Sequence, residues 1–137
     1  MTELRTALFD ALQSIYQLPA FAALEDMIQG ETLLLQYLSF HQQETVCPSD
    51  LSDALRLSRS RITGAITSLR KKGLVRSCHS ETDRRRVEVS ITEKGLDQIQ
   101  EKRLRLDRYF DKMLAGLGEA DARALIALIQ KCEEVMR

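Results

Sequence analysis

The spacing of apolar residues divides the chain into helices separated by one pair of short strands. The first helix is predicted by a stripe that ends before Pro19 and consists of Leu4, Leu8, Leu12 and Ile15. A shorter helical pattern, AFAALEDMI, stops at Gly30, and the run ETLLLQYLSFHQ that begins at Glu31 is strongly apolar and helical in length. We expect this third helix to lie inside the fold, as a support under the elements that follow it.

Two short helices are predicted next, joined by a tight connection. Pro48 suits the first helical position, where its missing N–H group would have no partner, and an apolar stripe follows at Leu51, Ala54 and Leu55. Ser58 can cap the second of these helices through its hydroxyl group. The second helix then places its apolar residues at helical spacing on one side, at Ile62, Ile66 and Leu69.

A hairpin is predicted after the second short helix. Gly73 ends that helix just beyond two lysines, which favour the negative end of the helix dipole. The segment from Leu74 to His79 is predicted to be one strand, and apolar residues that alternate with polar ones predict another at Val87, Val89 and Ile91. The polar loop between them, Ser80 to Arg86, ends in three arginines. A basic hairpin tip beside a basic helix is typical of a wing that reaches phosphate or the minor groove.

Two longer helices complete the chain. Thr92 can cap the first, whose apolar seam is interrupted only by Arg103 and consists of Leu96, Ile99, Leu106, Phe110, Met113 and Leu117. We expect Gly116 and Gly118 to end it and a last helix to run from Asp121 to Met136. The centre of that last helix is apolar around most of its circumference, at Leu125, Ile126, Leu128 and Ile129. Because so small a chain has little room to bury this surface, we expect a homodimer built from the first and last helices.

The exposed side of the second short helix is small, polar and basic. At 100° per residue, the side opposite the apolar stripe carries Ser60, Gly64, Thr67 and Lys71, with Arg61, Thr63 and Ser68 beside them. A glycine inside a helix costs about 0.5–1 kcal/mol relative to alanine, so Gly64 indicates the close approach of another surface. Arginine can bond guanine, and serine or threonine can bond several bases, so this side suits a major groove.

The distribution of charge supports the same interpretation. Lys plus Arg and Asp plus Glu number 20 each, so the formal net charge is zero, which by itself argues against a nucleic-acid partner. Between Arg56 and Arg86, however, ten basic residues stand against two acidic ones, which leaves ten basic and eighteen acidic residues elsewhere. That segment therefore carries +8 and the remainder −8. Binding to a polyanion depends on the local patch, so a basic face on an acidic body favours nucleic acid.

Size and composition restrict the class of protein further. A chain of 137 residues is about one domain long and can bury a real core. No apolar run approaches the length of about 20 residues that crosses a membrane, and the first residues lack the pattern of a secretory signal. Three cysteines without an export signal favour a reducing compartment, so we expect a cytoplasmic protein with no membrane partner.

Two stretches of the sequence resemble a known family. The run DRRRVEVSITEKG, from Asp83 to Gly95, resembles the wing-to-helix signature of the MarR family of winged-helix regulators, and SDLSDALRLSRSRITGAITSLRKKGLV, from Ser49 to Val75, resembles its two DNA-reading helices. The resemblance implies a symmetric homodimer that binds a palindromic DNA site, with recognition helices in successive major grooves and wings in flanking minor grooves. It also implies that small molecules control many such proteins by entering a cleft between the dimer helices and the DNA-binding lobe.

The family pattern assigns roles to residues of this chain. Arg59 to Thr67 would read the major groove, Arg85 would enter the minor groove, and Asp83 would orient a basic partner such as an arginine of the recognition helix. The full set of expected DNA contacts is Ser49, Arg59, Ser60, Arg61, Thr63, Gly64, Thr67, Lys71, Arg84 and Arg85. Two residues depart from the family pattern. Gly64 stands where a bulkier polar residue is common, and Cys47 replaces a usual serine or threonine cap.

Other candidate sites were weighed against simpler structural roles. Cys47 at a helix start is a candidate redox residue, because the positive dipole end favours a thiolate, although a small, inert structural residue is the simpler and favoured explanation. Cys78 and Cys132 are interpreted as packing residues. His41, Cys47, Cys78 and His79 lack paired metal-ligand spacing, so no metal site and no cofactor are expected. Aromatic residues that could line an effector pocket, or simply belong to the core, are Tyr16, Phe21, Tyr37, Phe40, Tyr109 and Phe110.

Together these patterns predict a mainly α (α+β) fold, a winged helix-turn-helix with long terminal helices that form a dimerisation lobe. The expected parts are N-terminal dimerisation helices (1–30), a DNA-binding lobe (31–91) and C-terminal dimerisation helices (92–137). No nucleophilic triad or phosphate-binding loop supports an enzyme. The predicted function is a DNA-binding transcriptional regulator, most simply a repressor, with double-stranded DNA, a second copy and a small-molecule effector as partners. The alternatives are a thiol- or metal-responsive regulator and a winged-helix protein-interaction module, although the latter would present an apolar or acidic helix.

Overall fold

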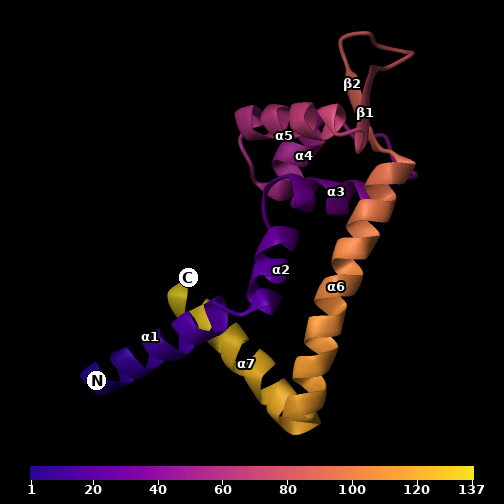
Figure 1. Ribbon diagram of the computed structural model, residues 1–137. Coiled ribbons are helices and arrows are strands. Elements are labelled where there is room, and N and C mark those ends of the chain that lie inside the picture. Colours follow the sequence, from indigo (N-terminus) through magenta and orange to yellow (C-terminus); the bar gives the residue numbers. More distant parts are fainter.

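Seven helices and one two-stranded antiparallel sheet form the protein. The computed structural model describes residues 1–137 (Figure 1), and its elements are α1 (Thr2–Tyr16), α2 (Pro19–Met27), α3 (Gly30–Phe40), α4 (Pro48–Leu55), α5 (Arg59–Lys71), β1 (Val75–His79), β2 (Val87–Ile91), α6 (Glu93–Leu117) and α7 (Glu119–Met136). This is the predicted mainly helical fold with a winged helix-turn-helix, and each helix and strand expected from the pattern is present.

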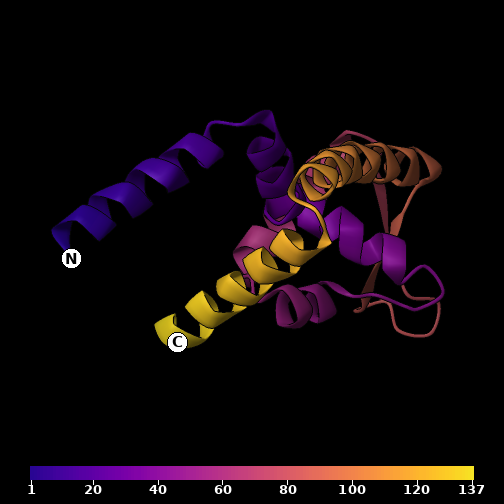
Figure 2. The same cartoon turned by 90° about the horizontal axis from the view of Figure 1, so that it is seen from below.

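The elements form a packed lobe and a more open one. The packed lobe contains α3, α4, α5 and the β1–β2 hairpin, and α6 runs from it to the opposite end of the molecule (Figure 1). At that end the chain reverses and α7 returns at an angle to α6, while α1 extends outward at the N-terminus (Figures 1 and 2). The chain therefore places the hairpin and α5 at one end of a long helix and both terminal helices toward the other.

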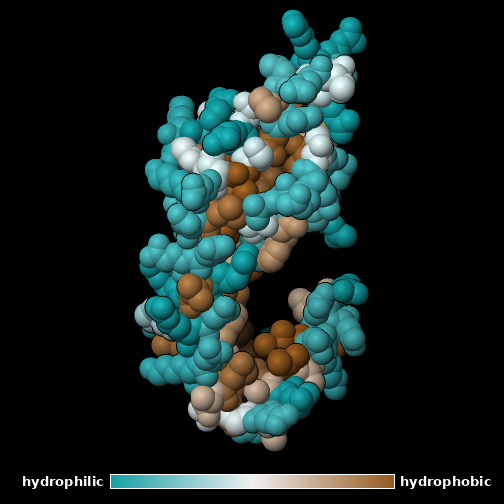
Figure 3. Space-filling model, turned by 90° about the vertical axis from the view of Figure 1, so that its right-hand side faces the viewer, coloured by the Kyte–Doolittle hydropathy of each residue, from teal (hydrophilic) through white to brown (hydrophobic).

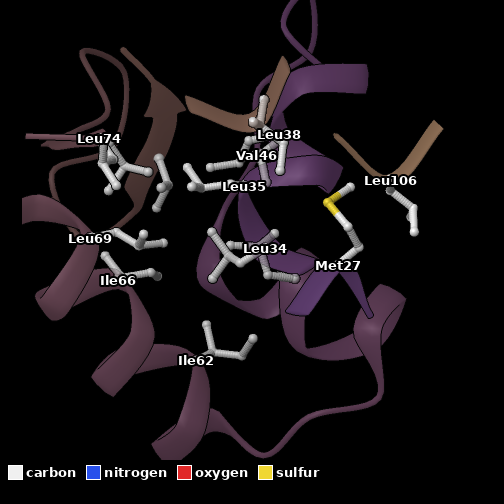
Figure 4. Close-up of a cluster of buried hydrophobic side chains, with 14 residues drawn as sticks. Met27, Leu34, Leu35, Leu38, Val46, Ile62, Ile66, Leu69, Leu74 and Leu106 are labelled. Carbon is white, nitrogen blue, oxygen red and sulfur yellow. The ribbon is translucent and has the colours of Figure 1, made fainter. Parts of the chain in front are cut away.

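The hydrophobic core is centred on α3. Figure 4 shows side chains of α3 meeting those of α5, and the largest side chains that are fully buried are Leu34, Leu35, Leu51, Ile62, Leu69, Leu74 and Ile99. The apolar run from Glu31 therefore forms the inner support that its composition predicts. Ile62, Ile66 and Leu69 all face this core from α5, so the opposite side of α5 is left exposed.

Local capping fixes the helix-turn-helix. Cys47 is the N-cap of α4, and the Asp50 carboxylate accepts a hydrogen bond from the Cys47 N–H at 2.9 Å in a capping box. α4 ends at Arg56, whose left-handed backbone (φ 54°) lets the Leu57 N–H donate to the Ser52 carbonyl at 3.3 Å. Ser58 then caps α5 by accepting from the Arg61 N–H at 3.2 Å, as predicted.

The base of the hairpin is fastened to the start of α6. Gly73 follows α5 with a φ of +77°, and the Thr92 hydroxyl donates to the Gly73 carbonyl at 2.7 Å while it accepts from the Gly95 N–H at 3.1 Å. A Cβ added to Gly95 would collide with the Leu74 carbonyl oxygen, so only glycine permits this packing. The predicted cap at Thr92 is confirmed, and it links three elements.

The far end of α6 differs from the prediction. Gly116 lies inside α6, and Gly118 alone separates it from α7, which begins at Glu119 instead of Asp121. The reason is conformational, because Gly118 has a φ of +82° whereas Gly116 has no positive φ and continues the helix. The interruption of the seam at Arg103 is accommodated because its guanidinium carbon lies 4.6 Å from the centre of the Phe40 ring.

The terminal helices leave apolar surface uncovered. The stripe predicted on α1 is exposed, with Leu4 at 65% and Leu12 at 57% of full exposure, and α7 exposes Ile126, Leu128 and Ile129. Figure 3 shows hydrophobic side chains gathered around a hollow in the lower part of the molecule. Packing within one chain therefore does not use the faces that the sequence predicted for dimerisation. None of the helices combines the length and apolar character needed to traverse a bilayer.

Candidate nucleic-acid interface

The exposed side of α5 carries the residues predicted to read DNA. Arg59, Ser60, Arg61, Thr63 and Gly64 are all exposed, because the core takes the opposite side of the helix. A Cβ added to Gly64 would meet nothing within 4 Å, so no part of this chain requires a glycine at that position. The expected close approach at Gly64 is therefore not made within the chain.

The two remaining residues expected on α5 are placed differently from each other. Thr67 is half-buried, and its hydroxyl donates to the Thr63 carbonyl at 2.9 Å, which leaves only its acceptor capacity for a ligand. Lys71 is exposed at the last turn. Its neighbour Lys72 instead forms an ion pair with Glu31 of α3, with 2.7 Å between Nζ and Oε2.

The wing tip is held by hydrogen bonds within its own loop. Ser80 is buried, its N–H donates to the Arg86 carbonyl at 2.8 Å, and its hydroxyl oxygen accepts from the Thr82 and Asp83 N–H groups at 3.3 and 3.4 Å. The sequence analysis did not identify this role, although a serine before a polar turn is a recognised signal of such a loop. The result is a defined tip on which Arg84 and Arg85 are exposed.

The expected role of Asp83 is not what the structure shows. Its carboxylate accepts a hydrogen bond from the backbone N–H of Arg85 at 3.0 Å, and it forms no ion pair with an arginine of α5. An Asp side chain that bonds to the backbone two residues ahead forms a local turn, and this bond competes with a distant partner. Asp83 therefore shapes the wing tip itself.

The basic residues of this region are almost free of internal compensation. Of the ten between Arg56 and Arg86, Lys72 alone forms an ion pair. The exposed side of α5 and the wing lie at the same end of the molecule (Figure 1), while Ser49 is half-buried in the first turn of α4. Unpaired positive charge at one end of an otherwise acidic molecule is the arrangement that attracts a polyanion.

One carboxylate couples this region to the rest of the fold. Partial burial acts to raise the pKa of Glu31, but hydrogen bonds from Lys72 and Ser68 and the positive charges of Lys72 and Lys102 outweigh it, so the pKa lies below its usual value. Lys102 of α6 also pairs with Asp26 of α2, with 3.0 Å between Nζ and Oδ2. These two ion pairs connect α5 to α3 and α6 to α2, and sequence analysis did not predict them.

The cysteines are distributed differently from the prediction. Cys47 is buried, with 4% of its surface exposed, whereas Cys78 on β1 and Cys132 on α7 are exposed and do not pack in the chain. The alternation along β1 accounts for Cys78, because Val75 points into the core and Cys78 lies three residues later on the other face. No group of three or more His, Cys, Asp or Glu side chains is arranged to hold a metal ion.

The six aromatic residues expected around an effector do not form one pocket. Tyr16 contacts Phe21 with 5.0 Å between ring centres, Tyr37 stacks on His41 at 4.0 Å, and Phe40 is exposed beneath Arg103. Phe110 packs against the core, and Tyr109, its neighbour on α6, is half-buried. Within one chain these rings lie at separate places, and their role in an effector pocket stays a prediction.

Two cavities lie near the DNA-binding lobe, and Tyr37 is the one residue of the six that lines either of them. The larger, of about 910 Å³, is bordered by α2, α3, α5 and α6, and the two ion pairs lie at its edge with Arg61, Leu69 and Gln98. The smaller, of about 570 Å³, lies between α3, α4 and the wing and includes Tyr37, Asp50, Asp53 and Arg86. The larger cavity therefore touches both the exposed helix α5 and the long helix α6.

Comparison with known proteins gives consistent results. The model of the MarR family matches residues 26–86, which include α3, α4, α5, β1 and the wing loop. The chain is 31% identical over 85 residues to the HTH-type transcriptional regulator PapX of Escherichia coli, which covers 62% of this chain and 52% of PapX. It is 36% identical over 74 residues to the transcriptional repressor MprA of Escherichia coli K12, which covers 53% of this chain and 42% of MprA.

Solved structures agree with this fold over almost the whole chain. A mutant of S. aureus MepR bound to an oligodeoxyribonucleotide has a TM-score of 0.66 and 20% identity, over 97% of this chain and 98% of that one. S. aureus MepR bound to ethidium bromide has a TM-score of 0.67 and 20% identity, over 96% of each chain. The present chain spans about half the length of the curated relatives that it matches. The wing motif, the match of the family model to residues 26–86 and the similarity to PapX and MprA together show that this chain resembles the regulators of the MarR family.

Proposed function

We propose that this protein is a DNA-binding transcriptional regulator that acts as a homodimer on a palindromic site. The observation that carries the proposal is the set of exposed, unpaired basic and small polar residues on α5 and the wing tip, at one end of the molecule. An α-helix fits the major groove, and arginines on a hairpin tip fit the adjacent phosphates and minor groove. The DNA-bound structure of MepR supports the same partner.

We propose different roles in DNA binding for α5 and for the wing tip. Ser60, Arg61 and Thr63 would face base edges and set sequence preference, whereas Arg84 and Arg85 would contribute charge that acts on any sequence. Ser49, at the positive end of α4, would donate to a phosphate. Each base contact of good geometry contributes about 1–3 kcal/mol of discrimination, so the α5 residues carry the specificity.

A selection of binding sites from random duplex DNA, repeated at two salt concentrations, tests this function. We expect an enriched palindrome whose half-sites lie about one helical turn, ~34 Å, apart. Replacement of Arg85 by Ala should lower the slope of log affinity against log salt by about one unit for every sequence. The matched control is Arg105→Ala, which removes an exposed arginine of α6 and should leave the slope unchanged. An unenriched pool, or the same slope for both variants, would contradict the proposal.

The homodimer is proposed from the uncovered apolar faces. Leu8, Phe9 and Leu12 on α1 are each more than half exposed, as are Leu128 and Ile129 on α7, and monomeric soluble proteins rarely expose contiguous apolar surface of this kind. A second copy supplies matching faces through a twofold axis, which also presents two α5 helices to two half-sites.

Sedimentation at micromolar concentration tests the dimer. We expect twice the 15.6 kDa mass of one chain. Leu12→Glu should shift the mass toward the monomer, because it would bury a charge in the interface. Gln13→Glu adds the same charge one residue further along α1 and should not change the mass. A wild-type protein that sediments as a 15.6 kDa monomer would contradict this part of the proposal.

Repression and control by a small molecule are proposed from the relatives and from the larger cavity. MprA is a repressor, and MepR is known with ethidium bound, which supports a chain that leaves its DNA site when a ligand binds. The larger cavity is bordered by Arg61 of α5, by Lys72 just after α5 and by Gln98 of α6, so a ligand there would favour one placement of α5 over another.

Titration of ethidium into the protein in the absence of DNA tests whether that cavity binds a ligand. Asp26 and Glu31 are paired with Lys102 and Lys72, so Glu25 is the carboxylate of this cavity that forms no ion pair and that could attract a cation. We expect a saturable rise in ethidium fluorescence that Gln98→Trp weakens, because the indole would occupy part of the cavity beside α6. Gln100→Trp, an exposed position on the same helix, is the matched control. Equal binding by both variants would exclude this cavity as the ethidium site.

A further inference from the structure

The third arginine of the wing is turned toward the protein, unlike the two before it. Arg86 Nε donates to the Sγ atom of Cys47 across 2.9 Å, although the two residues lie 39 positions apart in the sequence. All three arginines are exposed, but Arg84 and Arg85 form no side-chain hydrogen bond to the rest of the chain. The run of three arginines therefore divides into two with free side chains and one whose side chain is bonded to the protein.

The contact joins the wing to the start of the helix-turn-helix. Cys47 is the buried N-cap of α4, and a second bond lies beside it, from the Val89 N–H of β2 to the Val46 carbonyl at 2.8 Å. The backbone bond fixes the middle of β2. The Arg86 contact lies three residues closer to the tip, at the point where the loop leaves the strand, so it controls the direction of the tip.

The surroundings of Arg86 are suited to a guanidinium. The contact with Cys47, and to a smaller extent the negative charges of Asp50 and Glu88, raise the pKa of Arg86 above its usual value. Asp50 and Asp53 border the same cavity as Arg86, and Asp50 is itself held by the capping box. The hydrogen bond to Cys47 therefore occupies the Nε–H group of Arg86, and this group is not available to a phosphate.

We propose that Arg86 and Cys47 form a positioning pair that docks the wing on the N-terminus of α4 and so sets the direction of Arg84 and Arg85. The proposal rests on the DNA-binding function proposed above. It accounts for Cys47 at a cap position, since a thiol reaches further from the backbone than the hydroxyl of a serine. It also assigns to the third arginine a role other than phosphate binding.

Replacement of Arg86 should affect DNA binding differently from replacement of Arg84 or Arg85. Arg86→Ala should weaken binding by about 3- to 10-fold, the value of one hydrogen bond, at an unchanged salt slope. Cys47→Ala should produce a loss of the same size, and the double variant should lose no more than either single one. Both variants keep the bond from the Cys47 N–H to Asp50, so α4 is retained, which circular dichroism checks.

A second readout does not depend on DNA. In a Cys78→Ser, Cys132→Ser background, Cys47 is the only thiol, and its labelling by a thiol reagent reports whether the wing covers it. We expect Arg86→Ala to accelerate labelling several-fold and Arg84→Ala to leave it unchanged, whether or not the wild-type protein binds DNA. If the wild-type protein did not bind DNA, the proposed function would be contradicted, but the labelling result would still test the pair of Arg86 and Cys47. Unchanged labelling in Arg86→Ala, additive losses in the double variant, or a salt slope lowered by about one unit as for Arg85→Ala would overturn the positioning pair.

Discussion

Gly64 offers a test in which stability and DNA binding should change in opposite directions. It lies in the middle of α5 on the exposed side, has no positive φ, and has open space where a Cβ would be. Within the chain, alanine is therefore the better residue, because glycine loses more conformational freedom when the helix forms. A glycine that costs stability and that no contact in the chain requires points to a surface that arrives from outside.

The magnitudes follow from helix propensity and from packing. Gly64→Ala should raise the free energy of unfolding by about 0.5–1 kcal/mol, which for a chain of this size is roughly 2–4 °C in Tm. If DNA approaches the backbone at Gly64, the added methyl group overpacks the interface, at a cost of about 1–3 kcal/mol. That cost corresponds to a loss of affinity of about 5- to 150-fold.

Thermal unfolding and DNA binding should be measured on the same preparation at one protein concentration, because dimerisation makes Tm depend on concentration. Gly116→Ala is the matched control, since Gly116 is also helical and also has open space around it, but lies at the far end of α6. It should raise Tm by a similar or smaller amount and leave DNA affinity unchanged. If Gly64→Ala raised Tm and bound the selected DNA as tightly as the wild type, the placement of this side of α5 against the groove would be refuted.

Three further changes test the fold and its coupling. Glu31 has a lowered pKa, so its contribution is complete above its ordinary value of 4.5 and is lost as pH falls through the lowered one. The wild-type protein should therefore lose free energy of unfolding, measured in urea, between neutral pH and about pH 3. In Glu31→Gln this loss should be smaller by less than ~1 kcal/mol, because the ion pair is partly exposed. An equal loss in both proteins would mean that another group is responsible. Gly95→Ala should destabilise by about 1–3 kcal/mol in urea unfolding, because the Cβ would meet the Leu74 carbonyl, and wild-type stability would show that this junction can relax. Ile62→Ala, at a fully buried site, should cost about 2–5 kcal/mol in the same assay, and a cost well under ~1 kcal/mol would contradict its place in the core.

The sequence predicted the elements well because their signals are local. The apolar stripe of α5, the cap at Ser58 and the break at Gly73 each depend on residues within a few positions of one another, and all three were confirmed. Gly116 was misassigned because a glycine near a helix end has the same appearance in a sequence whether or not its φ is positive. Only the backbone conformation distinguishes it from Gly118.

Contacts between distant residues were the part that the sequence could not supply. Arg86 meets Cys47 and Lys72 meets Glu31 across 39 and 41 positions, and no periodicity specifies such partners. Asp83 had two chemically reasonable partners, and the nearer backbone N–H formed the bond. Aromatic residues such as Tyr37 carry equal signals for a pocket and for stacking, so the pattern alone does not specify which of them would line an effector pocket.

The length of α6 has a mechanical consequence. Its 25 residues form a rod of about 37 Å that is anchored at the wing base by Thr92 and Gly95 and ends beside α7. Tilting such a rod by ~10° about one end sweeps the other through about 6 Å, close to two base-pair rises of DNA. Leverage of this kind means that the tilt of α6 against α7, and not merely the presence of an added methyl group there, would decide how far apart two reading heads stand.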